Sequence, residues 1–198
     1  MTMSAATPER SRLRAELRAR RKAFVAALPR PVRNLAFRVL PSPVMALLPP
    51  DACIALYRPT GSEAPTDSIA ETLFDLGFAL CLPRLGMRAD DPHHMDFAAW
   101  TPNDALVPGP SRIPQPDFGA EAVMPDVVFT PLVGFDAQLN RLGQGAGHYD
   151  RAFEQLQDAL KIGLAWSCQQ VEALPVEPWD VPLDMIVTEQ RIFERAEA

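Results

Sequence analysis

The segment DVVFTPLV occupies residues 126–133, and GFDAQLNRLGQGAGHYDR follows it at residues 134–151. The first segment is apolar at nearly every position, which is typical of a central strand covered on both faces of a sheet. The second has glycine at three alternating positions, Gly143, Gly145 and Gly147, before a helical pattern over residues 148–160. We therefore predict a buried strand, a glycine-rich loop and a helix, in that order.

Short apolar runs alternate with helical patterns on both sides of this segment. Strands are predicted at residues 53–57, 78–82, near 95–97, at 161–166 and at 185–188, with an amphipathic helix at 67–76. We expect Pro83 to stop the second strand, residues 86–125 to form loops with short strands, and residues 185–188 to be the last strand. Strand–helix–strand order implies right-handed crossovers. The prediction is an α/β fold: a single three-layer α/β/α domain over residues 1–198 with a mostly parallel, Rossmann-like sheet.

The N-terminal region predicts a long helix. Thr7, Pro8 and Glu9 have the pattern of an N-cap, a first-turn proline and a first-turn acid. The helix would carry an apolar stripe, with arginines on its other sides and prolines at its end: Leu13, Leu17, Phe24 and Leu28, then Pro29 and Pro31. A weaker helical pattern over residues 35–48 is interrupted at Pro41 and Pro43.

Composition limits the classes of protein. The net charge is −6 and the pI is about 5.1, which excludes a general nucleic-acid binder, although seven basic residues cluster near the N-terminus: Arg10, Arg12, Arg14, Arg18, Arg20, Arg21 and Lys22. No apolar run is long enough to span a bilayer, and the N-terminus lacks the apolar core of a secretory signal. The three cysteines lie far apart, without zinc-ligand spacing, so we predict a reducing, cytoplasmic location.

The glycine-rich loop predicts a phosphate site. Alternating glycines allow backbone N–H groups to turn toward one point, and the N-terminus of the following helix adds free N–H groups and a positive dipole end. Arg141 adds a fixed charge. The loop is neither a Walker A motif nor a dinucleotide fingerprint, and a simple tight turn is an equally good interpretation of its spacing.

The run Arg141-Leu142-Gly143-x-Gly145-x-Gly147-x-Tyr149-Asp150-Arg151 resembles the signature of the 5-formyltetrahydrofolate cyclo-ligase family. Further matches extend over nearly the whole chain: Leu13-Arg14-x-x-Leu17, Glu63 with Thr66, Leu82-Pro83-Arg84, Ile113-Pro114-Gln115-Pro116, Pro131, Phe135-Asp136, Gln169, Pro175, Asp180, Asp184 and Thr188-Glu189.

This resemblance implies that the chain uses ATP to cyclise 5-formyltetrahydrofolate to 5,10-methenyltetrahydrofolate, with Mg²⁺ as the cofactor. It assigns ATP binding to Arg10, Arg14, Arg141, Leu142, Gly143, Gln144, Gly145, Ala146, Gly147, His148 and Tyr149. It assigns folate binding to Arg58, Glu63, Gln144, Gly145, Ala146, Gly147 and His148, catalytic roles to Arg141 and Tyr149, and the metal to Asp150 and Asp180. The implied partners are ATP and folate, with no nucleic acid, no membrane and a monomeric chain.

Plainer interpretations remain open for these residues. Arg10 and Arg14 could belong to a solvated basic face, and Asp150 could be a first-turn helix acid. Asp180 could form a turn, and Glu63 could be a surface acid. Asp184 is predicted to be structural, and Trp100 and Trp166 are predicted in the core. Asp90, Asp91, His93 and His94 could bind a metal, although a solvated loop is favoured.

Leu139 and Ala146 depart from the family pattern, where Leu139 replaces the usual glycine. If Leu139 fills the loop, a nucleotide has no room there. An alternative function is therefore a catalytically weakened relative that binds folate or nucleotide. A third hypothesis, an RNA-associated protein using the N-terminal arginines, is disfavoured because no aromatic residues are interleaved with them.

Overall fold

The computed structural model describes residues 7–86, 91 and 94–195. Within this part of the chain, seven strands form one sheet in the order β11-β10-β9-β6-β1-β2-β3. Their bounds are β1 (Cys53–Ala55), β2 (Ala79–Leu85), β3 (Met95–Ala99), β6 (Val127–Pro131), β9 (Leu160–Leu164), β10 (Met185–Val187) and β11 (Ile192–Glu194).

The five central strands of the sheet are parallel, which confirms the predicted fold class. Strand β6 lies between β1 and β9, and it is buried at four of its five residues. The edge strands β3 and β11 are antiparallel to their neighbours. The prediction that residues 185–188 form the last strand is wrong, because β11 follows and pairs with β10.

Strand β2 continues through Pro83 to Leu85, so the prediction that Pro83 stops it is also wrong. Strand β1 pairs with β2 only as far as Cys81. Beyond that residue β2 pairs with β3, where Pro83 lies opposite Phe97. A proline is tolerated there because one side of the strand needs no ladder hydrogen bond.

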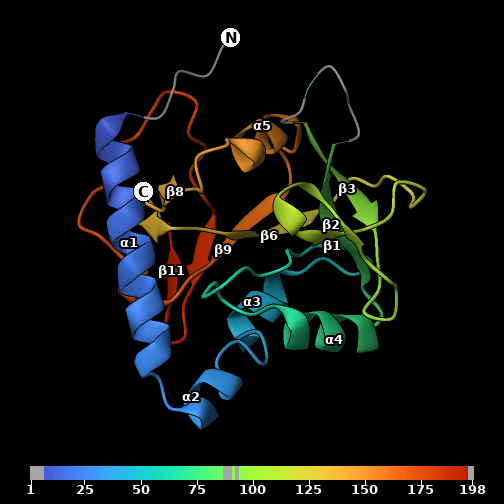
Figure 1. Cartoon of the computed structure of the whole chain (residues 1–198). Coiled ribbons are helices and arrows are strands. Elements are labelled where there is room, and N and C mark those ends of the chain that lie inside the picture. The colour runs from blue at the N-terminus through green and yellow to red at the C-terminus, as the bar shows by residue number, and fades with distance from the viewer. Residues whose placement is uncertain (1–6, 87–90, 92–93, 196–198) are drawn as a thin grey trace.

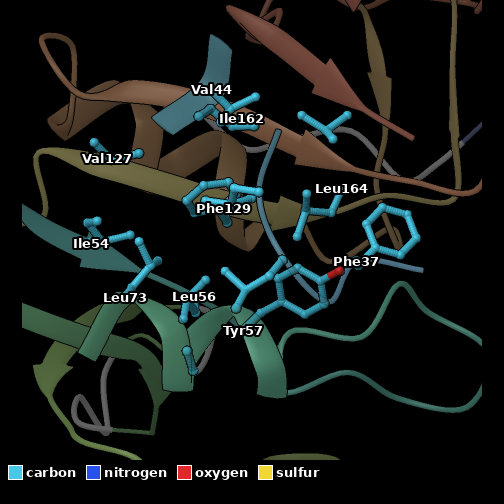
Figure 2. Close-up of a cluster of buried hydrophobic side chains, with 14 of the residues drawn as sticks. Phe37, Val44, Ile54, Leu56, Tyr57, Leu73, Val127, Phe129, Ile162 and Leu164 are labelled. Carbon is cyan, nitrogen blue, oxygen red and sulfur yellow. The ribbon is translucent and has the colours of Figure 1, made fainter. Parts of the chain in front are cut away.

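Helices cover both faces of the sheet and give the predicted three layers (Figure 1). Helices α3 (Ser42–Leu47) and α4 (Asp67–Asp75) lie on one face, and α5 (His148–Gln155) lies on the other. Successive residues of the strands alternate between the two faces, as pleating requires. Ile54 and Phe129 join the cluster beneath α3 and α4, whereas Val128 joins the cluster beneath α5. Figure 2 shows Val44 of α3 and Leu73 of α4 meeting the sheet residues of the first cluster.

The long N-terminal helix α1 (Pro8–Ala27) runs along one side of the molecule (Figure 1). Thr7 caps it through its side-chain oxygen, as predicted. The apolar stripe is present, but the expectation that arginines cover only the other sides is wrong. The buried residues of α1 are Arg10, Arg14, Leu17 and Arg21, which share one side of the helix at offsets of 4, 7 and 11 residues.

Of the weak helical pattern predicted over residues 35–48, only α3 is helical, and the chain between Leu35 and Ser42 is not. A second short helix, α2 (Arg30–Leu35), precedes this pattern and was not predicted. Pro31 and Pro43 lie in the first turns of these helices, where a proline ring is tolerated. Helix α5 ends at Gln155, five residues before its predicted end.

Short elements complete the fold: β4 (Val107–Pro108), the 3-10 turn η1 (Pro110–Arg112), β5 (Pro114–Gln115), β7 (Gly134–Phe135), β8 (Arg141–Leu142) and η2 (Ser167–Gln169). Strands β4 and β5 confirm short strands between residues 86 and 125. The β7–β8 hairpin lies inside the segment predicted as a loop. Trp100 and Trp166 are buried, as predicted.

Asp90 and His93 of the possible metal cluster lie outside the described residues. No group of three or more potential ligands from histidine, cysteine, aspartate and glutamate occurs among the described residues. A membrane-spanning helix is likewise not found in the part of the chain that the structure describes.

Candidate active site

A cavity of about 620 Å³ opens where the parallel strands end. Tyr57 follows β1, Leu85 ends β2 and Pro131 ends β6, and all three line it. The carboxyl ends of parallel strands are where open α/β sheets bind their ligands. The volume is in the range of small-molecule sites.

Residues 134–142, which we call the platform, are mostly buried and carry Arg141 at the cavity. The platform contains the β7–β8 hairpin, whose Gly134 pairs with Leu142 and whose Phe135 pairs with Arg141. Asp136 is its hub. The carboxylate of Asp136 accepts hydrogen bonds from the backbone N–H groups of Gln138, Asn140 and Leu174 at 3.0–3.1 Å, and from the Asn140 amide at 3.0 Å.

Leu139 lies at the turn of the platform with φ +63°, in the left-handed region that favours glycine. Its side chain is fully buried in the cluster that contains Phe153 and Leu183, and it does not line the cavity. The departure from the family pattern at this position is therefore accommodated in the core. It leaves the space beside the glycines open.

Residues 143–147 follow the platform and form the rim of the cavity, which we call the cradle. Gly145 and Gly147 have φ values of +110° and +67°, a backbone conformation that glycine adopts more easily than other residues. Gly147 is also the N-cap of α5, which places the free N–H groups of the helix start at the cavity. Cradle residues contact the rest of the protein mainly through arginines: Arg14 donates to Gly143 O at 2.9 Å, and Arg18 donates to Gln144 Oε1 and O.

Two buried arginines of α1 face the cavity together with the cradle. Arg10 donates to both carboxylate oxygens of Asp180, at 2.7 and 3.1 Å. Burial lowers the pKa of Arg14, and the nearby charges of Arg10 and Arg18 lower it further. An anion bound beside Arg14 would offset this unfavourable burial of like charges.

Arg141 and Tyr149 also line the cavity and lie close to each other. The Arg141 guanidinium is ion-paired with Asp150 and lies 5.6 Å from the ring centroid of Tyr149. The Nε atoms of Arg141 and Arg10 are buried without a hydrogen-bond partner in the described part of the chain. Buried donors without partners are uncommon and are compatible with a ligand acceptor. Burial raises the pKa of Tyr149, so its hydroxyl stays protonated at neutral pH and cannot serve as a base there.

Glu63 also lines the cavity and is 9 % exposed. Its Oε2 accepts from the Thr60 N–H at 2.9 Å and from the Thr60 hydroxyl at 3.1 Å. Its Oε1 accepts from the Gln144 side-chain amide at 2.8 Å. Glu63 is thus a fixed, buried acceptor and not a surface acid.

An apolar wall faces these polar groups. It consists of Pro83, Leu85, Met95, Pro110, Ile113 and Pro114. Gln115 anchors the wall, because its buried amide accepts from Leu85 N and donates to Leu85 O, both at 3.1 Å. Arg84 pairs with Asp96 and also donates to the carbonyl oxygens of Asp117 and Ala120.

The cavity brings together all but one of the site residues that the sequence predicts. The exception is Leu142, whose side chain is fully buried in a cluster with Leu17, Val133 and Leu174 and does not line the cavity. Arg58 lines the cavity while pairing with Asp67 at 2.6 Å. Three buried residues that support the site are not among the residues predicted for it: Asp136, Gln115 and Arg84. Their only sequence signal is membership of the matched motifs.

Charge in the cavity is balanced. Four arginines and four carboxylates from the described residues line it: Arg10, Arg14, Arg58 and Arg141, with Glu63, Asp150, Glu177 and Asp180. Triphosphate alone would therefore leave excess negative charge, which favours entry with a divalent cation.

Asp150 and Asp180 fit a hard cation in different ways. Asp150 Oδ2 accepts no hydrogen bond from any described residue, whereas both oxygens of Asp180 are engaged by Arg10. Asp150 could therefore bind Mg²⁺ directly, and Asp180 could do so once Arg10 turns toward a phosphate. Asp184 accepts from Lys161 N at 2.8 Å, which is consistent with a structural role.

The fold and the cavity define a class of protein. It is an α/β protein in which a glycine-rich loop, buried arginines and a buried carboxylate line one cavity. The profile of the 5-formyltetrahydrofolate cyclo-ligase family matches residues 6–189, and the chain belongs to that family.

Similar proteins agree with this membership. The chain is 38 % identical over 141 residues to the 5-formyltetrahydrofolate cyclo-ligase of Haemophilus influenzae, covering 68 % of this chain and 74 % of that protein. It is 35 % identical over 147 residues to the Escherichia coli protein of the same name, covering 71 % and 80 %. The solved structure of Aquifex aeolicus 5,10-methenyltetrahydrofolate synthetase superposes with a TM-score of 0.71 at 26 % identity, covering 94 % of each chain. The Mycoplasma pneumoniae synthetase gives 0.66 at 26 % identity, covering 91 % of this chain and 98 % of that one.

Proposed function

We propose that this chain catalyses the ATP-dependent cyclisation of 5-formyltetrahydrofolate to 5,10-methenyltetrahydrofolate, with release of ADP and phosphate. The observation that carries the proposal is the joining of two recognition elements in one cavity. Gln144 belongs to the cradle, and its side chain donates to Glu63 at 2.8 Å, so the anion site and the buried carboxylate are neighbours.

The formyl oxygen is a poor leaving group until it carries a phosphoryl group. The formyl oxygen attacks the γ-phosphorus of ATP, and the bond from that phosphorus to ADP breaks. The folate N10 then attacks the activated carbon and loses its proton, and phosphate departs. This reaction needs two substrates held in line and a spread of phosphate charge, and it needs no covalent nucleophile from the protein.

ATP would bind with its phosphates on the cradle. Backbone N–H groups at Gly147 and the start of α5 would face the phosphate oxygens, with Arg14 and Arg141 beside them. Arg10 would exchange Asp180 for a phosphate, which would satisfy its unpartnered Nε. When bound, Mg²⁺ would neutralise phosphate charge, with Asp150 and Asp180 as its protein ligands.

The folate would bind between Glu63 and the apolar wall. A carboxylate accepts paired N–H donors from an aminopyrimidine ring, and Glu63 offers such a carboxylate once Gln144 releases Oε1. Arg58, His148 and the protonated Tyr149 line the same cavity and would complete the folate contacts. We propose that the chain acts as a monomer in the cytoplasm, without nucleic-acid or membrane partners.

The weakened-relative alternative has little support. Its strongest ground was Leu139, and that side chain is buried away from the cavity. Ala146 remains, but an alanine in the exposed cradle leaves the backbone free to bind phosphate.

Turnover of 5-formyltetrahydrofolate with Mg-ATP, followed by the absorbance of the methenyl product, tests the proposal. Wild type is expected to turn over. Asp150→Ala is expected to lose most of the rate, about 100-fold, because it removes a metal ligand and the partner of Arg141. Asp158→Ala, at an exposed acid beyond the end of α5, is the control. Binding of both ligands without turnover by wild type would contradict the proposal, and equal rates for Asp150→Ala would remove Asp150 from the metal site.

A further inference from the structure

Arg21 is a buried cation that the proposed reaction does not use. It lies on the buried side of α1, seven residues after Arg14, and is 6 % exposed. Unlike Arg10 and Arg14, it does not line the cavity. A buried guanidinium is unfavourable unless it is paired and hydrogen-bonded, so its contacts indicate what it is for.

The contacts of Arg21 join α1 to two segments that border the cavity. Its Nε donates to Ser62 Oγ at 3.1 Å, and its Nη1 donates to Leu132 O at 3.2 Å. The same Nη1 lies 3.9 Å from Glu63 Oε1. Ser62 and Glu63 belong to the segment after β1, and Leu132 directly follows β6.

Glu63 is held from several directions, and Arg21 supplies the positive charge. Thr60 fixes Oε2 from within the same turn, and Gln144 contacts Oε1 from the exposed cradle. Gln144 has to leave when a ligand takes its place, whereas Arg21 can stay because it lies outside the cavity lining.

The electrostatic surroundings of Arg21 support this arrangement. Burial lowers the pKa of Arg21, and the Glu63 carboxylate is the largest influence that opposes this. The other titratable groups near Arg21 are Tyr57, Arg18 and Cys168. The Glu63 charge thus offsets part of the unfavourable burial of the Arg21 cation.

We infer that Arg21 is a positioning residue that fixes the Glu63 carboxylate and supplies its counter-charge for recognition of the pterin ring. The inference rests on the proposed function, because Glu63 has this role only if the second ligand is a folate. Arg21 acts through Glu63 and touches neither substrate.

Steady-state kinetics of Arg21→Met test the inference. The KM for 5-formyltetrahydrofolate is expected to rise about 10-fold or more, because removing one partner of a buried ion pair leaves the Glu63 carboxylate without its counter-charge. The KM for ATP and kcat are expected to stay within about 3-fold. Arg20→Met is the matched control, because the neighbouring Arg20 is exposed and donates to Gln170 O. A change in both KM values by the same factor, or in neither, would overturn the inference.

A double-mutant cycle with Glu63→Gln separates positioning from a general structural role. In the Glu63→Gln background, Arg21→Met is expected to change the folate KM by less than about 3-fold, because the effect passes through the missing carboxylate. If the two substitutions instead raise the folate KM independently, so that the change in the double variant is the product of the two single changes, the inference would be overturned. Glu63→Gln that leaves the folate KM unchanged would instead overturn the folate role of Glu63, and so the proposed function of this part of the cavity.

Two milder variants keep the test valid if Arg21→Met does not fold. Ser62→Ala removes one acceptor of Arg21 and is expected to raise the folate KM by about 2-fold to 5-fold. Arg21→Lys keeps the charge but not the fork of donors, and its folate KM is expected to fall between those of wild type and Arg21→Met. An unchanged folate KM in both variants would overturn the inference.

Discussion

The platform and the cradle are consecutive in the chain, yet the protein holds them in opposite ways. The platform is buried or half-buried except at Ala137 and Gln138, its backbone pairs with itself, and the Asp136 carboxylate accepts hydrogen bonds from its turn. The cradle is largely exposed, and side chains from other elements hold it: Arg14 and Arg18 of α1, and Arg151, which donates to Ala146 O at 2.6 Å. A mostly buried base beside an exposed rim suits a site that must bind a triphosphate and release a diphosphate.

The largest expected effect on stability comes from the platform. Asp136→Ala removes a buried acceptor and leaves the buried Leu174 N–H without its partner. The expected loss in the free energy of unfolding is roughly 3 kcal/mol or more. Urea denaturation measures it, with Asp136→Asn as the control that keeps one acceptor and the shape. A loss below about 1 kcal/mol would mean that the platform does not depend on the hydrogen bonds of the Asp136 carboxylate.

Removing a contact of the cradle should change ATP binding more than the free energy of unfolding. Arg14→Ala removes a cation that borders the proposed phosphate site and donates to Gly143 O. The KM for ATP is expected to rise about 10-fold to 100-fold, since charged hydrogen bonds contribute about 1.5–3 kcal/mol. The free energy of unfolding should change less than in Asp136→Ala. Arg12→Ala, at an exposed position of the same helix, is the kinetic control, and an unchanged ATP KM in Arg14→Ala would argue against a phosphate contact.

Leu139 gives a second test of the difference between the two regions. It adopts a strained backbone conformation in the platform, but its side chain does not line the cavity. Leu139→Ala loses buried surface but keeps the left-handed conformation, and it is expected to destabilise the protein by about 2–5 kcal/mol. Leu139→Gly is expected to be about 0.5–1 kcal/mol more stable than Leu139→Ala, because glycine adopts this φ without strain. Denaturation curves give the order, and the reverse order would contradict the strain.

Both Leu139 variants should keep the ATP KM within about 2-fold while they remain folded. A larger change would show that the platform and the cradle are energetically coupled, and it would weaken the distinction between them.

The smallest expected effect concerns Gln144, which links the cradle to Glu63. Gln144→Ala removes an internal donor that competes with the ligand for Glu63 Oε1. The folate KM is expected to fall about 2-fold to 5-fold, the net contribution of one hydrogen bond. A rise in the folate KM would show that the Gln144 side chain itself binds the substrate.

The same contrast explains how far the sequence could predict the molecule. The strand at residues 126–133 is apolar at nearly every position, and the glycines of the cradle alternate, so both regions leave a local pattern. The supports of the site do not. Asp136 and Gln115 are buried, although polar residues are usually exposed, and Asp136 bonds to Leu174 far along the chain.

Arg21 and Leu139 illustrate the same limit at single residues. In the sequence, Arg21 is one of seven clustered basic residues, and only the packing of α1 against the segments after β1 and β6 distinguishes it from its exposed neighbours. The sequence alone predicts that Leu139 obstructs the loop, because this leucine precedes the alternating glycines and replaces a glycine of the family pattern. Its side chain direction depends on a φ of +63°, which the residue type does not predict.

Amide hydrogen exchange of the protein with and without a non-hydrolysable Mg-ATP analogue tests the central claim most directly. If the cradle binds the triphosphate, amide exchange at residues 143–149 should slow strongly when the analogue binds. The exchange rates of the platform amides, which are already slow, should change little. Exchange at residues 143–149 that is unaffected by a saturating analogue would contradict the claim.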